Sequence, residues 1–179
     1  DKAQRLIKVP PMTESQIRQA LELGIQECLL NGITMFDDAG VSLQTINMYK
    51  EYAAQGKLDM RIYAMAGGLG TMRAIGKPMM DQGNFLTVRT VKLAADGALG
   101  SRGAALLEPY EDDPGNSGFY TTPPESVYTA AQYALQNGWQ VATHAIGDRA
   151  NRMMLDMYEK AMNEFPHVKD HRFRDEHTQ

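Results

Sequence analysis

Several features that would mark a specialised class of protein are scarce or absent in this chain of 179 residues. A single cysteine, Cys28, excludes an internal disulfide framework and weakly favours a reducing compartment such as the cytoplasm. Lysine and arginine number 18 against 22 acidic residues and form no basic run, which argues against nucleic acid or an anionic membrane as the main partner. No apolar run approaches the roughly 20 residues of a membrane span. Residues 1–5 do not form a signal peptide.

The chain does contain a regular alternation of helix and strand patterns. Capping boxes, apolar stripes at helical spacing and glycine turns predict helices over residues 13–31, 42–55, 122–137 and 148–165. Short runs rich in β-branched residues predict strands over residues 33–36, 61–66, 87–95, 139–144 and 171–177. Repeated β-α units of this kind indicate an α/β fold with a parallel sheet and helices outside it. No linker interrupts the chain, so it is expected to be one domain or a contiguous piece of one.

The connections between these elements differ in character. Residues 37–40 are expected to form a turn after the first strand, with Asp37 and Asp38 shaping it, and residues 69–84 form a looser stretch. Residues 96–121 are rich in turn formers, and a loop of this length typically lines or covers a site. Asp148 is expected to be the N-cap of the last helix.

Three residues with useful chemistry stand where strands are expected to end. Lys92 lies late in the third predicted strand, His144 closes the fourth and His177 closes the fifth. The carboxyl ends of parallel strands form the active-site edge in such folds. Each residue also has a simpler reading: a lysine can extend to solvent, and a histidine can be a hydrogen-bonded residue of the rim or core.

Strand alternation gives the orientation of the first two residues. Val91, Leu93 and Ala95 share one face of their strand, so Lys92 lies on the other, and the same parity places His144 opposite Val141. The apolar face should meet the helices, which leaves Lys92 and His144 facing inward. An inward lysine is costly unless it is neutralised, paired or modified. The strand at 171–177 is too polar for parity to decide its orientation.

Three blocks of sequence resemble a known family. Residues 91–106 (VKLAADGALGSRGAAL), 144–150 (HAIGDRA) and 176–179 (EHTQ) resemble signatures of the YtcJ-like branch of the amidohydrolase superfamily, also called amidohydrolase family 3, in the same order. Residues 32–40 resemble the second barrel strand of that family. The resemblance covers nearly the whole chain and implies a (β/α)8 TIM-like barrel. Residues 1–179 would then be a single piece of the barrel domain, covering about strands 2–6 and incomplete at both ends.

The resemblance also implies a chemistry. Such enzymes hydrolyse a small-molecule substrate with one or two divalent metals, often zinc. Lys92 would be the lysine that becomes carboxylated to bridge the metals, with His144 and His177 as imidazole ligands. Because an ammonium cannot ligate a metal but an anionic carbamate can, this role fits an inward lysine. The segment that contains Asp96 and Arg102 lacks the Gly-Lys-Ser/Thr of a phosphate loop, and these two residues are expected to contact the substrate.

Parts of the family pattern are missing. The chain has neither the His-x-His pair of the first barrel strand nor the last-strand aspartate, so its catalytic general base is expected to lie outside the chain. Asp175 stands where an apolar residue is usual before Glu-His, which puts the packing of the last strand in question. The two ends of an open half-barrel would expose strand edges and favour self-association, so the isolated chain is expected to be inactive and to form oligomers.

Three functions remain open on this basis. The first is metal-dependent hydrolysis of a non-peptide carbon–nitrogen bond in an amide, formamide or cyclic amide. The second is a non-catalytic or truncated barrel that only binds metal or a partner. The third is a lactonase or phosphoester hydrolase, since one scaffold can support several reactions.

Overall fold

The computed structural model describes residues 6–8, 10–82 and 85–179, and the expectation for residues 1–5 lies outside this part of the chain. The described helices are α1 (Glu14–Leu30), α2 (Leu43–Ala54), α3 (Gly68–Ile75), α4 (Pro124–Asn137) and α5 (Asp148–Glu164). The described strands are β1 (Met35–Val41), β2 (Arg61–Gly67), β3 (Met79–Gln82), β4 (Leu86–Ala94), β5 (Gln140–Ala145) and β6 (Arg174–His177). None of these helices combines the length and apolar character that a bilayer crossing requires.

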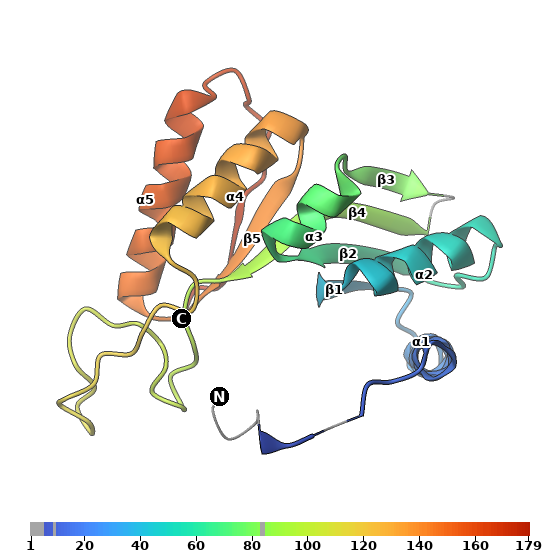
Figure 1. Cartoon of the computed structure of the whole chain (residues 1–179), viewed down its shortest axis with the longest axis horizontal. Coiled ribbons are helices and arrows are strands. Elements are labelled where there is room, and N and C mark those ends of the chain that lie inside the picture. The colour runs from blue at the N-terminus through green and yellow to red at the C-terminus, as the bar shows by residue number, and fades with distance from the viewer. Residues whose placement is uncertain (1–5, 9, 83–84) are drawn as a thin grey trace.

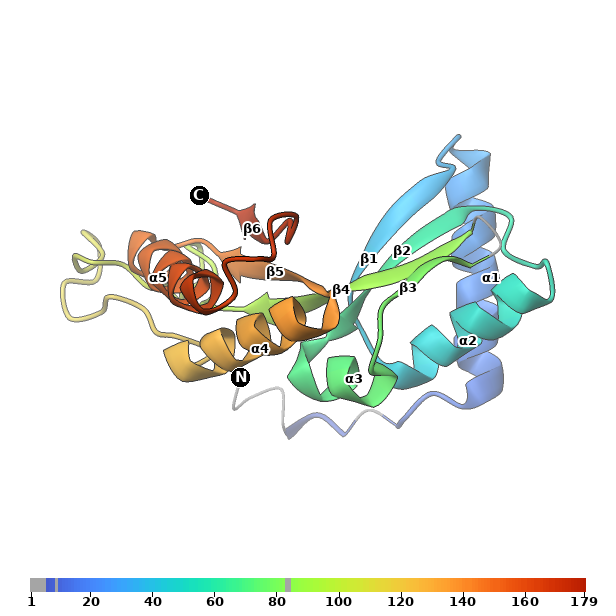
Figure 2. The same cartoon turned by 90° about the horizontal axis from the view of Figure 1, so that it is seen from above.

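The strands form one mixed sheet that curls into an open trough. Its order is β1-β2-β4-β5-β6, every neighbouring pair on this path is parallel, and β3 pairs antiparallel with β4. Figures 1 and 2 show the strands forming a curved wall with helices along its outer side. The predicted α/β class, the parallel sheet and all five predicted strands are therefore confirmed, in the form of a half-barrel.

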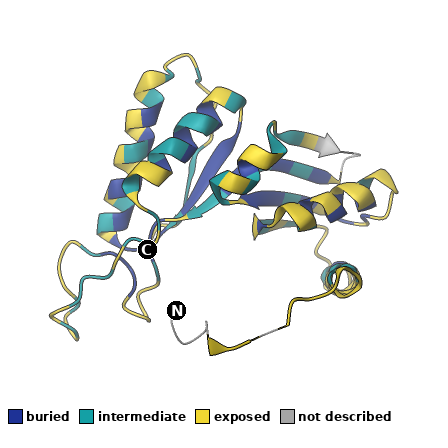
Figure 3. Cartoon of the chain, in the orientation of Figure 1, coloured by how far each residue is buried: buried dark blue, intermediate teal, exposed yellow. Residues whose placement is uncertain are grey.

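The apolar core fills the space between the outer face of the sheet and the helices. Val91 of β4 and Val141 of β5 are fully buried there against helix residues such as Ala131 of α4 and Met154 of α5. Figure 3 shows the same division, with buried central strands and a largely exposed β1 at the free edge. The sheet is thus apolar on its outer face, as strand alternation predicts.

The inner face of the trough carries a polar layer near the amino ends of the strands. The Tyr63 hydroxyl of β2 lies 2.6 Å from Thr90 Oγ1 of β4 and donates to Gln140 Oε1 of β5 at 2.5 Å. Gln140 also donates through Nε2 to the carbonyl oxygen of Arg172, 3.3 Å away. These hydrogen bonds connect β2, β4 and β5 across the inner face, and Lys92 follows Thr90 on that face.

Several local expectations are wrong. Residues 37–40 continue β1 instead of forming a turn, and Asp38 accepts a hydrogen bond from Tyr49 of α2. The looser stretch contains α3 and β3, which the sequence did not reveal because short elements give weak periodic signals. The last strand is shorter than expected and starts only at Arg174.

The helix starts show which capping signals are used. Thr13 and Gln16 form the predicted capping box of α1, with the Thr13 backbone N–H donating to Gln16 Oε1 at 2.8 Å. α4 begins after Pro123 without any side-chain cap, so the capping box expected at the start of this helix is absent. The N-cap of α5 is Gly147, not Asp148, which is the first helical residue.

Candidate metal centre

Lys92 projects from the inner face of β4 near its carboxyl end. Its neighbour Val91 belongs to the core on the outer face, whereas Thr90, two residues earlier, joins the inner polar layer. A Cβ built at Gly40 would lie 4.0 Å from Lys92 Cγ, so the lysine stem runs beside the end of β1. This placement confirms the inward orientation that strand alternation predicted.

The surroundings of Lys92 lower the pKa of its side-chain amine. Partial burial lowers its pKa from the ordinary lysine value, and the positive charge of Arg174 acts in the same direction. The negative charges of Glu176 and Asp175 oppose this shift, and burial outweighs them. A neutral amine is a nucleophile, whereas an ammonium is not.

His144 and His177 lie in contact at the ends of β5 and β6. Their ring centroids are 4.7 Å apart, with the ring planes at 71°. Thr143 hydrogen-bonds Tyr158 of α5 on the outer side, so His144 follows it on the inner side. His177 pairs with Ala145 in register, and its positive φ of 79° turns the chain out of the extended conformation. The fold therefore brings together two imidazoles from adjacent strands.

The register relates these imidazoles to Lys92. Lys92 pairs with Ala142 of β5, and His144 is the next residue of β5 on the same face. Diagonal neighbours of this kind on one sheet face are roughly 7–8 Å apart, within reach of a long side chain. Among residues 6–8, 10–82 and 85–179, no three His, Cys, Asp or Glu side chains form a metal-binding group.

Polar residues of β6 complete the inner face. The sequence suggests that Glu176 orients its neighbours or pairs with an arginine. Arg174 donates through Nε to Glu176 Oε1 at 2.7 Å, and its Nη1 lies 3.9 Å from Asp37 Oδ2 on β1. Arg174 thus reaches across the trough from the last strand to the first. The sequence shows that Arg174 and Glu176 share one face of this strand. Because the strand is polar on both faces, the sequence does not show which face points inward.

Asp175 points to the other side of β6. It pairs with Thr143 in register, on the face that meets α5, and burial raises its pKa. Its Oδ1 is buried and has no hydrogen-bond partner in the described part of the chain, as is also true of Asn151 Oδ1. The unusual residue before Glu176 therefore places a carboxylate against the helix layer, where an apolar side chain would pack without this cost.

Asp96, expected to contact the substrate, is engaged with the protein backbone. It is 2% exposed, and its two carboxylate oxygens accept hydrogen bonds from the N–H groups of Ala105, Ile146 and Gly147 at 2.8–3.0 Å. Its Oδ1 also lies 3.4 Å from His144 Nε2. These contacts join the loop after β4 to the turn between β5 and α5.

Arg102, the second expected substrate contact, lies on the exposed part of the same loop. Its guanidinium forms two hydrogen bonds with Asp112, at 3.1 and 2.7 Å, and these hold the pKa of the Asp112 carboxyl below its usual range. The backbone of Arg102 adopts a positive φ of 53°. The substrate roles of Asp96 and Arg102 stay predictions.

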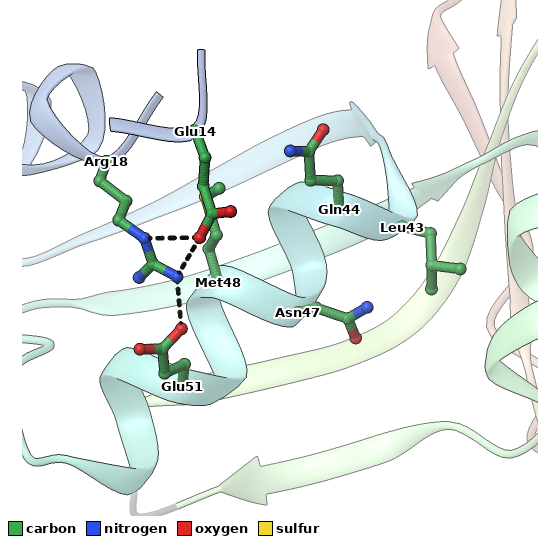
Figure 4. A pocket seen from close by; sticks show the side chains of 7 residues that line it. All are labelled: Glu14, Arg18, Leu43, Gln44, Asn47, Met48 and Glu51. Atoms are coloured by element: carbon green, nitrogen blue, oxygen red, sulfur yellow. Dashed lines mark hydrogen bonds and ion pairs between the residues drawn. The ribbon is translucent and has the colours of Figure 1, made fainter. Parts of the chain in front are cut away.

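A hollow elsewhere on the surface does not involve these residues. It has a volume of about 410 Å³ and lies between α1 and α2, where Arg18 bridges Glu14 and Glu51 through contacts of 2.7 and 2.6 Å (Figure 4). None of the three expected ligands lines it. The charged groups in this hollow pair with one another and hold α1 against α2.

The fold and this edge define the class of the protein: an α/β half-barrel with two imidazoles and an inward lysine at the carboxyl ends of adjacent parallel strands. The sequence model of the amidohydrolase family matches residues 1–179. The chain therefore belongs to the amidohydrolase family, as its sequence blocks indicated.

Two curated proteins are similar to this chain. YtcJ of Bacillus subtilis (strain 168), which carries the name of an amidohydrolase, is 33% identical over 170 residues, covering 89% of this chain and 31% of YtcJ. Protein LONG AFTER FAR-RED 3 of Arabidopsis thaliana is 46% identical over 97 residues, covering 53% of this chain and 16% of the plant protein. The chain thus spans a third or less of the length of these relatives.

Two solved structures share the fold. Both are uncharacterized metal-dependent hydrolases, one from Pyrococcus horikoshii OT3 with 28% sequence identity and one from Pyrococcus furiosus with 25% identity. Each superposes with a TM-score of 0.80 over 97% of this chain, which corresponds to 39% and 40% of the respective archaeal chains.

Proposed function

We propose that this chain carries part of the metal site of a hydrolase that cleaves non-peptide carbon–nitrogen bonds in small-molecule amides, formamides or cyclic amides. Residues 1–179 would form one piece of a TIM-like barrel domain, with β1, β2, β4, β5 and β6 as barrel strands 2–6. The metal is a divalent ion, zinc in the first instance, present as one or two ions. Lys92, His144 and His177 are its proposed ligands in this chain.

One observation carries the proposal: His144 and His177 touch at the carboxyl ends of β5 and β6, while Lys92 projects from the same inner face of β4. Nitrogen and oxygen donors bind zinc at roughly 2.0–2.2 Å, so ligands must come from neighbouring side chains. Membership of the amidohydrolase family and similarity to metal-dependent hydrolases support this use of the edge.

Lys92 has the chemistry to become an anionic ligand. Its lowered pKa increases the fraction of neutral amine, and the Nζ lone pair can attack the carbon of carbon dioxide. A nitrogen–carbon bond forms, one carbon–oxygen π pair moves onto oxygen, and the amine releases a proton to solvent. The resulting carbamate offers two oxygen donors in place of an ammonium that could offer none.

The remaining residues hold these donors in place. Arg174 spans the trough between Asp37 and Glu176 and adds positive charge near Lys92, which favours an anionic carbamate there. A divalent ion bound at this edge would lower the pKa of a water ligand and polarise a substrate carbonyl. The aspartate expected to handle the proton is proposed to lie outside residues 1–179, and Arg102 is proposed to contact the substrate from the loop.

The test compares metal content and amide turnover in the full-length protein and in single variants. We expect Lys92→Ala, His144→Ala and His177→Ala each to lose metal and to lower turnover by more than about 100-fold, since even groups that only support metal ligands cost 10–100-fold. The matched control is His167→Ala, which removes an exposed histidine after α5 and should change neither quantity. A ¹³C-bicarbonate-labelled sample should show a carbamate carbon that Lys92→Ala lacks.

Metal and turnover that survive all three substitutions would refute the proposed ligand set. Substrate panels of N-acyl compounds, formamides, lactones and phosphoesters decide the reaction class. Turnover confined to lactones or phosphoesters would replace the carbon–nitrogen assignment with the third function that the sequence leaves open.

A non-catalytic barrel is the second candidate. It is the alternative that the sequence leaves open, in which the barrel only binds metal or a partner. A full-length protein that binds metal through His144 and His177 but turns over none of the panel would support this second function.

A further inference from the structure

A buried carboxylate that the proposed reaction does not use lies beside one of the proposed ligands. Asp96 accepts three backbone hydrogen bonds: from Ala105 at 2.9 Å and Gly147 at 2.8 Å on Oδ2, and from Ile146 at 3.0 Å on Oδ1. Such bonds stabilise a carboxylate that has little access to water. With 2% of its surface exposed, Asp96 has little room to touch a substrate.

The hydrogen-bond partners of His144 determine which ring nitrogen carries its hydrogen. Nε2 lies 3.2 Å from the carbonyl oxygen of Gly97 and 3.4 Å from Asp96 Oδ1. Both neighbours are acceptors, and a neutral imidazole has one N–H donor and one acceptor nitrogen. The hydrogen therefore belongs on Nε2, which leaves Nδ1 with the free lone pair that a metal or another acid can use.

The position of Asp96 is fixed by close backbone packing. Ala105, which donates to Asp96, is fully buried and accepts a hydrogen bond from Ala150 N at 3.3 Å. A Cβ added at Gly147 would collide with the carbonyl of Ala105, and one at Gly118 would collide with the carbonyl of Ala104. The segment of the loop that donates to Asp96 is therefore packed closely against two glycines.

We propose that Asp96 is a positioning residue, which together with the Gly97 carbonyl holds the His144 imidazole in the tautomer with hydrogen on Nε2. This role is separate from the substrate contact that the sequence suggested, which stays a prediction. It also anchors the loop after β4 against the turn between β5 and α5. The consequence for metal binding rests on the proposed function, whereas the tautomer itself does not.

The test is ¹⁵N NMR of histidine ring nitrogens in the metal-free full-length protein, at a pH where imidazoles are neutral. The His144 signals are assigned by their loss in His144→Gln. In the wild type we expect a protonated Nε2 and an unprotonated Nδ1, which differ strongly in nitrogen chemical shift. A wild-type His144 with hydrogen on Nδ1 would overturn the proposal without any variant.

Asp96→Asn is the informative variant. Its amide can keep one oxygen for the N–H groups of Ala105 and Gly147. The NH2 group then faces His144 Nε2 and gives up the hydrogen bond from the Ile146 N–H. We expect the tautomer to shift toward hydrogen on Nδ1. Asp148→Asn is the matched control, because Asp148 also accepts a long-range backbone hydrogen bond on the same loop, from Leu107 N at 2.8 Å. The other hydrogen bond to Asp148 comes from the Arg149 N–H.

The control should leave the His144 signals unchanged. Equal changes in both variants, or none in Asp96→Asn, would assign Asp96 a purely structural role. If Asp96→Asn does not fold, Asp96→Glu replaces it, because it keeps the carboxylate and displaces it by one methylene. A mixed tautomer then supports the proposal and an unchanged one contradicts it.

A metal titration separates this inference from the proposed function. Asp96→Asn should weaken metal affinity by about 10–100-fold, as expected for a group that orients a metal ligand, while Asp148→Asn should not. A wild type that shows the expected tautomer but binds no metal would sustain the role of Asp96 and refute the metal site.

Discussion

Helices α1 and α4 differ in what supports them: α1 has a strong local capping signal, whereas α4 is packed more extensively against the core. α1 has 17 residues and a complete capping box, yet only Ile25 is buried. α4 has 14 residues and no side-chain cap, yet it buries Val127, Ala130, Ala131, Ala134 and Leu135. The difference teaches that a cap decides where a helix begins, whereas tertiary packing decides how much the helix contributes to stability.

The same contrast divides the whole molecule. The half built from β4, β5, α4 and α5 encloses most of the core and carries Lys92 and His144. The half that begins with α1 and β1 leaves large apolar side chains exposed, including Leu30 at 82% and Met35 at 50%. Two of the three proposed ligands, Lys92 and His144, thus project from the better-packed half, which suits residues that must keep a fixed geometry.

The largest effect that would test this contrast is expected in α5. Met154 is fully buried, so Met154→Ala should lower the free energy of unfolding by about 2–5 kcal/mol through lost apolar burial and a new cavity. Leu30→Ala in α1 is the control and should change stability by less than about 0.5 kcal/mol. Denaturant unfolding of the full-length protein measures both, and equal losses would break the comparison.

The next effect is expected at the turn before α5. Gly147→Ala places a Cβ against the carbonyl of Ala105. Both the N–H and the carbonyl of Ala105 already form hydrogen bonds. We expect a loss of about 1–3 kcal/mol, typical of overpacking in a site that cannot relax. Thermal and denaturant unfolding check the value. A neutral substitution would show that the loop after β4 is free to move.

A smaller and more local effect is expected at the start of α1. Thr13→Ala removes the side-chain acceptor of the capping box and should cost about 1 kcal/mol in that first turn. Because α1 buries little, the loss should appear as faster amide hydrogen exchange at Gln16 and Ile17 with little effect on α4. Faster exchange throughout α4 would instead show that the two halves unfold together.

The smallest effect is a gain. Gly24 lies inside α1, and a Cβ at this position meets nothing within 4 Å. Gly24→Ala should therefore stabilise the protein by about 0.5–1 kcal/mol through improved helix propensity. Set beside the loss at Gly147, this result would separate an open helix surface from a closely packed turn. A destabilised Gly24→Ala would indicate that a neighbour covers this face of α1.

The sequence alone located most of the elements, because their signals are local. Apolar periodicity predicted five strands and four helices, and it oriented Lys92 and His144 because Val91 and Val141 have to face the core. It could not orient β6, where Arg174, Asp175 and Glu176 give no apolar face, and it missed the short elements α3 and β3. The family blocks supplied the ligand roles, which periodicity could not.

The tertiary structure alone decided the contacts between residues that are far apart in the chain. In the sequence Asp96 is a polar residue of a loop. In the folded chain it is buried and accepts hydrogen bonds from the backbone N–H groups of Ala105 and of the turn after β5. The contact between His144 and His177 depends on the register of β5 and β6 and on the positive φ at His177. The sequence determined which side chains line one edge of the sheet, because alternation is a local property. Their partners were decided only by the packing of distant segments, because hydrogen bonds and ring contacts require atoms to meet within a few ångströms.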